Sequence, residues 1–141
     1  MGQVEILHYF LKIFFLLLLT FSHTYAGYYR EVKTISLTKD EQKKILVKYD
    51  AVEKLFKFRW TLFTNGGLVI HRSYDKIVAQ NILYLRDKNR SFRVELTPRG
   101  SKLYNAPYVL VKFKEFDYKT NEAIFEFLMS DKTMRIELEY L

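Results

Sequence analysis

The chain has 141 residues, about the size of one domain, and it carries a net charge of +7. It contains no cysteine, which excludes disulfides, cysteine-ligated zinc, iron–sulfur clusters, thiol nucleophiles and lipid attachment to an N-terminal cysteine. The positive charge favours anionic partners, but most lysines and arginines alternate with apolar residues, a pattern typical of a solvated strand face.

Residues 1–26 predict a membrane-targeting segment. Lys12 is the only lysine or arginine in it, and Ile13–Leu19 is an unbroken apolar run. A cation, a short apolar stretch and then small residues form the layout of a secretory signal peptide, which we expect to be cleaved between Ala26 and Gly27. The apolar run is shorter than the roughly 20 residues that a bilayer span needs.

An uncleaved N-terminal membrane anchor is the alternative. A helix over residues 6–25 would be long enough to cross the bilayer, with Lys12 as its one costly residue. Either interpretation puts residues 27–141, a single mostly-β globular domain, outside the cytoplasm. That domain is periplasmic or secreted if the segment is cleaved, and anchored to the inner membrane if it is not.

The first part of residues 27–141 predicts a strand followed by a helix. Residues 28–37 alternate weakly, as an opening strand does, and Thr38 with Glu41 has the spacing of a capping box. Apolar residues then follow at helical spacing, at Ile45, Leu46, Tyr49 and Val52. We therefore expect an amphipathic helix over residues 39–54, packed on the sheet that follows.

After residue 55 the apolar pattern changes to a period of two. Phe56, Phe58, Trp60 and Leu62 point to one side of a predicted strand, and we expect Trp60 to lie in the core. Asn65-Gly66-Gly67 is the strongest hairpin signal in the chain, because asparagine and glycine tolerate the positive φ of tight turns. Residues 68–74 then form the returning strand.

The second half predicts further strands joined by turns. Residues 75–86 suit a strand better than a helix, although both remain open, and residues 87–90 form a turn. Phe92, Val94 and Leu96 alternate as in a half-buried strand, and residues 97–107 are the longest irregular stretch. The last three strands, at about 108–118, 123–129 and 134–140, form a meander.

The expected fold class is therefore α+β. One N-terminal amphipathic helix packs on a mostly antiparallel sheet of six to eight strands. The pattern does not decide whether this sheet stays open, curls around the helix or closes into a barrel.

No pattern in the sequence predicts a catalytic, metal or cofactor site. His71 is the only histidine after residue 26, and its place in a strand favours a structural role. Asp75, Glu115 and Asp117 could serve a hydrolase if they met in one cleft, but carboxylates interleaved with lysines are typical of a solvated strand face. We expect no cofactor, and the sequence favours a non-enzymatic role while leaving enzymatic activity open.

Four residues are candidates for binding. Arg99 and Lys102 lie in the long irregular stretch and are suited to a phosphate or carboxylate, while Tyr104 and Trp60 belong to an unusually large aromatic set. Expected partners are another envelope protein, an anionic ligand or an apolar ligand. Export argues against nucleic acid as a partner. If the segment is not cleaved, residues 6–25 would contact the membrane.

The expected function is that of an exported, non-enzymatic protein that binds a ligand or acts as an envelope accessory. A membrane-anchored component of an envelope assembly is one alternative. A carboxylate-dependent hydrolase is the other.

Overall fold

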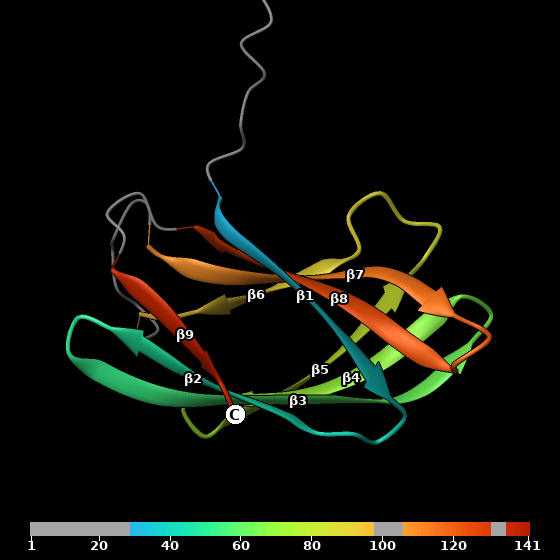
Figure 1. Ribbon diagram of the computed structural model, residues 1–141, viewed down its shortest axis with the longest axis horizontal. Coiled ribbons are helices and arrows are strands. Elements are labelled where there is room, and N and C mark those ends of the chain that lie inside the picture. Colours follow the sequence, from blue (N-terminus) through green and yellow to red (C-terminus); the bar gives the residue numbers. More distant parts are fainter. Residues whose placement is uncertain (1–28, 98–105, 131–134) are drawn as a thin grey trace, which may run out of the picture.

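The computed structural model describes residues 29–97, 106–130 and 135–141, which form nine strands in two antiparallel sheets. The sheets lie face to face, as Figure 1 shows. The four-stranded sheet has the order β1 (Arg30–Thr38), β8 (Glu122–Ser130), β7 (Tyr108–Asp117) and β6 (Ser91–Glu95). The five-stranded sheet has the order β5 (Ile77–Tyr84), β4 (Gly67–Tyr74), β3 (Val52–Thr64), β2 (Lys43–Tyr49) and β9 (Ile136–Tyr140).

The prediction of a helix over residues 39–54 is wrong, because the described residues contain no helix. The α+β fold class that depended on this helix is wrong as well. Residues 39–54 form a turn, all of β2 and the start of β3. The predicted capping box is a turn, in which the Glu41 N–H donates to the Thr38 carbonyl at 3.2 Å and Asp40 has a φ of 63°. The Glu41 carboxylate accepts the Thr38 N–H at 2.9 Å, as it would in a capping box, although no helix follows.

Three tight hairpins connect β2, β3, β4 and β5 in series. Each has two turn residues with positive φ, as type I′ turns require: Asp50–Ala51, Asn65–Gly66 and Asp75–Lys76. The hairpin predicted at Asn65 is confirmed. The question left open for residues 75–86 is settled as a strand, β5, which pairs with β4 along its whole length.

The meander expected at the C-terminal end is only partly correct. Strands β7 and β8 are neighbours, but β9 lies in the other sheet and pairs with β2, with Val47 opposite Leu138. An ion pair of 2.9 Å between Lys48 and Glu139 joins these two strands. The chain therefore crosses between the sheets after β8, as it does after β1 and β5.

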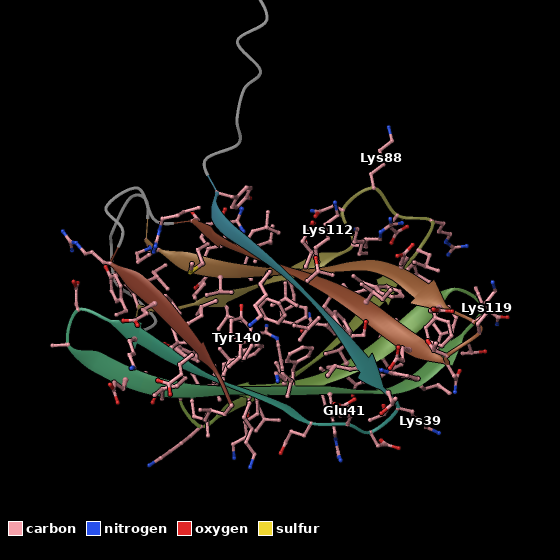
Figure 2. The ribbon with its side chains drawn as sticks, in the orientation of Figure 1. Lys39, Glu41, Lys88, Lys112, Lys119 and Tyr140 are labelled. Atoms are coloured by element: carbon pink, nitrogen blue, oxygen red, sulfur yellow. The ribbon has the colours of Figure 1, made fainter. Side chains whose placement is uncertain are left out.

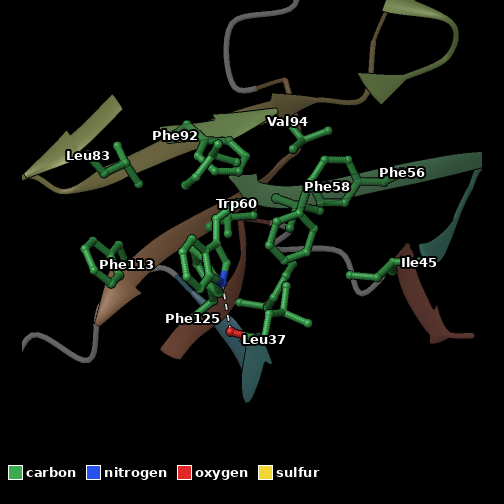
Figure 3. Close-up of a cluster of buried hydrophobic side chains, with 14 of the residues drawn as sticks. Leu37, Ile45, Phe56, Phe58, Trp60, Leu83, Phe92, Val94, Phe113 and Phe125 are labelled. Atoms are coloured by element: carbon green, nitrogen blue, oxygen red, sulfur yellow. Dashed lines mark hydrogen bonds between the residues drawn. The ribbon is translucent and has the colours of Figure 1, made fainter. Parts of the chain in front are cut away.

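Aromatic side chains from the inner faces of both sheets fill the core. The Phe58 ring of β3 lies 5.2 Å from that of Phe125 and 5.6 Å from that of Phe127, both on β8. Trp60 is buried, as expected, and its Nε1–H donates to the Leu37 carbonyl of β1 at 2.8 Å, as Figure 3 shows. This hydrogen bond joins the two sheets through the interior.

A β-bulge in β3 corrects the expectation that Leu62 points inward with Trp60. Trp60 pairs with Ile70 and Leu62 with Val69, so Thr61 is an extra residue that shifts the alternation. Phe63 then faces the core, and Leu62 is 49% exposed.

The two flanks of the sandwich differ. On one flank, β1 and β9 approach each other: Arg30 donates to the Ile136 carbonyl and the Lys33 amine lies 3.8 Å from the centre of the Tyr140 ring. Figure 2 shows Tyr140 between the sheets, whereas Lys88 and Lys119 point away from the body of the molecule. The opposite flank, between β5 and β6, holds a cleft.

Candidate functional site

The cleft lies where the β4–β5 hairpin faces β6, and its volume is about 290 Å³. That size is at the lower end for ligand pockets, which suits a small molecule or one group of a larger partner. Its walls combine cations, carboxylates and aliphatic side chains from both sheets: Lys54, Arg72, Tyr74, Asp75, Ile77, Val78, Ala79, Arg93, Val94, Glu95, Leu96 and Thr97.

Arg72 is the central cation of this cleft. It follows Leu68 and Ile70 in the inward register of β4, so its half-buried side chain enters the space between the sheets. The guanidinium lies 4.8 Å from the centre of the Phe92 ring of β6, and its Nε–H donates to Asn81 Oδ1 at 2.7 Å. Ring and amide together fix the guanidinium plane.

The terminal nitrogens of Arg72 remain available. Within the described residues, neither has a hydrogen-bond acceptor, and neither is buried away from solvent. Burial lowers the pKa of Arg72, while the charge of Glu95 acts in the opposite direction. A guanidinium with two free, oriented donors fits a carboxylate or phosphate.

Other polar groups of the cleft have contacts of their own. Lys54 Nζ lies 2.6 Å from Asp75 Oδ2, so the two side chains largely neutralise each other's charge. The Arg93 guanidinium lies 4.3 Å from the centre of the Tyr108 ring. Burial, with the charge of Asp75 as a second cause, raises the pKa of Tyr74 to about 12, so Tyr74 keeps its hydroxyl proton at neutral pH.

Most of the predicted binding residues lie outside the described part of the chain. Arg99, Lys102 and Tyr104 belong to residues 98–105, and the expected cleavage site at Ala26–Gly27 belongs to residues 1–28. Trp60 is described and is core, so its ring offers no binding surface. Thr97, the last described residue before residues 98–105, lines the cleft.

The structure does not bring the three candidate carboxylates together. Asp75 lies at the cleft near the Tyr108 end of β7, whereas Glu115 and Asp117 lie near its other end, on the order of 20 Å along the strand. Asp117 has a local structural role: its Oδ1 accepts the N–H groups of Lys119 and Thr120, and these bonds lower its pKa.

His71 lies opposite Arg59 on the outer face of the five-stranded sheet, so it does not face the cleft. Among the residues that the structure describes, no cluster of three or more metal-ligating side chains occurs. No helix able to span a membrane occurs in the same residues.

Sequence reasoning missed Arg72, Lys54 and Tyr74. A signal was present for the first and third: Leu68, Ile70, Arg72 and Tyr74 share one register of a strand, so a cation stands where an apolar residue is expected. Lys54 was missed because it was assigned to the predicted helix, whereas it lies near the start of β3.

Comparison with known proteins gave no similarity: no family model matches the chain, and no curated protein or solved structure matches it either.

Proposed function

We propose that the chain is an exported, non-enzymatic binding protein, and that its cleft receives an anionic group against Arg72. The observation that carries the proposal is the half-buried guanidinium, held by Asn81 and Phe92, with both terminal nitrogens free of acceptors among the described residues. Arginines that are fixed in this way bind carboxylates in two-point geometry with little loss of side-chain freedom.

The walls of the cleft suggest what accompanies the anionic group. Ile77, Val78 and Leu96 surround the charged groups with aliphatic surface. A carboxylate with a short apolar tail satisfies both features, since the tail gains from burial while the head meets the guanidinium.

Export remains part of the proposal and rests on the pattern of residues 1–26. The intact mass of the native protein, measured in soluble and membrane fractions, tests it. A mass that corresponds to residues 27–141 in the soluble fraction supports a cleaved signal. A mass that retains Met1 in the membrane fraction supports the anchored alternative.

Titration with octanoate, followed by calorimetry and by NMR, tests the cleft. We expect saturable binding that shifts the resonances of the cleft residues, and weaker binding of acetate, which lacks the tail. A charge-assisted hydrogen bond contributes about 1.5–3 kcal/mol, so Arg72→Gln should weaken octanoate binding about ten- to hundredfold.

Arg59→Gln is the matched control, because Arg59 is exposed and lies on the opposite face of the same sheet. It should leave octanoate affinity unchanged. Absence of saturable binding, or equal effects of the two substitutions, would overturn the proposed site. The wild type should bind octanol no more tightly than the Arg72→Gln variant binds octanoate, because octanol has the apolar tail without the negative charge.

A further inference from the structure

Strand β5 is an exposed sheet edge without charged residues. No described strand pairs with its outer side, and its eight residues include no lysine, arginine, aspartate or glutamate. Val78, Ile82 and Ile77 are 77%, 51% and 50% exposed. Each of the other edge strands carries charge: Arg30 and Lys33 on β1, Arg93 and Glu95 on β6, and Glu137 and Glu139 on β9.

Charged side chains are a common protection of edge strands, because an unprotected edge pairs readily with another chain. At a net charge of +7, copies of this chain repel each other. The β5 edge is the one described sheet edge where two copies can meet without placing charged strand residues side by side. Its chemistry therefore favours a second copy over a charged partner.

The backbone of β5 has a defined set of free groups. The two-residue turn makes Tyr74 and Ile77 a hydrogen-bonded pair, and at the other end the Leu85 N–H donates to the Gly66 carbonyl at 2.9 Å. Antiparallel ladders alternate, so the odd-numbered residues of β5 bond to β4. Val78, Gln80 and Ile82 then direct their N–H and C=O groups to the free edge.

We infer that two copies of the chain form a symmetric dimer through antiparallel pairing of their β5 edges, with the two-fold axis at Gln80. This alternation allows only registers centred on a residue, and the sequence is nearly symmetric about Gln80, with Val78 on one side and Ile82 on the other. In this register Val78 faces Ile82 of the second copy, and the two Gln80 amides face each other.

This dimer joins the two five-stranded sheets into one continuous sheet. Each copy contributes a single strand to the contact, so the buried surface area should be below the roughly 1,200 Å² that stable interfaces bury. The dimer should therefore be weak and concentration-dependent. On the exposed face the cross-strand pairs are Val78 with Ile82 and Gln80 with Gln80, an aliphatic and an amide pair, and such matched pairs stabilise antiparallel sheets.

Sedimentation velocity of the native protein, from low micromolar to millimolar concentration, tests the proposal. We expect a monomer–dimer equilibrium. Ile82→Lys should raise the dimer dissociation constant at least about tenfold, because it places a cation against Val78 of the second copy on both sides of the axis. Gln80→Pro should do the same by removing an outward N–H, while the bonds to β4 remain.

Leu62→Lys is the matched control, since Leu62 is as exposed as Ile82 but lies on the interior strand β3. It should leave the dissociation constant unchanged. A protein that stays monomeric throughout, assemblies larger than a dimer, or equal responses of Ile82→Lys and Leu62→Lys would each overturn the proposal.

A cross-link gives a second readout that does not depend on destabilising variants. The chain has no cysteine, so Gln80→Cys introduces a single thiol on the proposed axis. Residues in a hydrogen-bonded antiparallel pair have Cα atoms about 5.5 Å apart, within the range that a disulfide bridges. Mild oxidation should link Gln80→Cys into a dimer and leave Leu62→Cys monomeric; the reverse result would exclude the register.

Discussion

Trp60 contributes to stability through two separable interactions at the scale of one residue. Its ring packs edge-on against Phe116 at 5.7 Å, and its N–H satisfies the Leu37 carbonyl of the other sheet. Trp60→Phe keeps an aromatic ring but leaves that carbonyl without its donor, so unfolding should become easier by about 1–3 kcal/mol. Trp60→Ala should cost about 3–5 kcal/mol because it also leaves a cavity.

Urea denaturation followed by circular dichroism measures both losses. Tyr118→Phe is the control, because Tyr118 is 75% exposed and its hydroxyl is free to bond water. A loss below about 0.5 kcal/mol for Trp60→Phe would contradict the role of the inter-sheet hydrogen bond.

Tyr74 predicts a pH dependence in the alkaline range. Its pKa is about 12 in the folded chain and 10 in an unperturbed tyrosine. Below pH 10 the hydroxyl is protonated in both states and contributes its full stabilisation. Between pH 10 and 12 the unfolded chain ionises while the folded chain does not, so this contribution is lost as the pH rises.

Comparison of the wild type with Tyr74→Phe isolates the effect from that of the other tyrosines. The difference between their unfolding free energies should be constant up to about pH 10 and should change in favour of Tyr74→Phe above it. A difference that stays flat to pH 12 would mean that the Tyr74 hydroxyl is solvated in the folded state.

At the scale of the element, the hairpin turns carry the clearest backbone preferences. Ala51 has a φ of 62°, which is costly for a residue with a Cβ, whereas Gly66 occupies the equivalent place of the next turn. Ala51→Gly should therefore raise the free energy of unfolding by about 0.5–1 kcal/mol, and Gly66→Ala should lower it by about 1 kcal/mol. Thermal denaturation measures both.

Ala79→Gly controls for the general cost of glycine. Ala79 lies within β5, where glycine should destabilise the strand by roughly 0.5–1 kcal/mol. If Ala51→Gly also destabilises the protein, the added freedom of the unfolded chain outweighs the relief of the positive φ at this turn.

The same turns explain why the helix prediction was wrong. Residues 43–49 fit both periods, since Ile45 and Val47 are buried in alternation while Leu46 and Tyr49 add helical spacing. The deciding feature was Asp50–Ala51, a turn without glycine that the sequence did not reveal. The Asn65–Gly66 turn was predictable because its residues are the ones that positive φ favours.

Assignment of strands to the two sheets lay beyond the sequence for a different reason. The pairing of β2 with β9 joins Val47 to Leu138, far apart in the chain, and short strands of similar composition give no signal for such a partner. The cleft could not be predicted for the same reason, because Arg72 and Phe92 belong to different sheets and contact each other only when these sheets pack together.

At the scale of the whole molecule, Arg90 holds the sheets together on the flank that carries the cleft. It donates to the Leu85 carbonyl, just after β5, and its Nη2–H donates to the Lys114 carbonyl of β7 at 3.0 Å. Lys114 is the extra residue where the pairing of β7 with β8 shifts register. One guanidinium thus satisfies carbonyls from both sheets and stabilises a bulge that the regular ladder leaves unpaired.

Lysine cannot reproduce this geometry, because its single ammonium does not span two carbonyls in the fixed fork of a guanidinium. Arg90→Lys should lower the free energy of unfolding by about 1–2 kcal/mol, and amide exchange should accelerate around Lys114 and Leu85. Arg59→Lys, on the exposed outer face of β3, should change neither quantity. Equal stability of the two variants would show that the sheets are held by their aromatic core alone, with the Arg90 hydrogen bonds replaced by water at no cost.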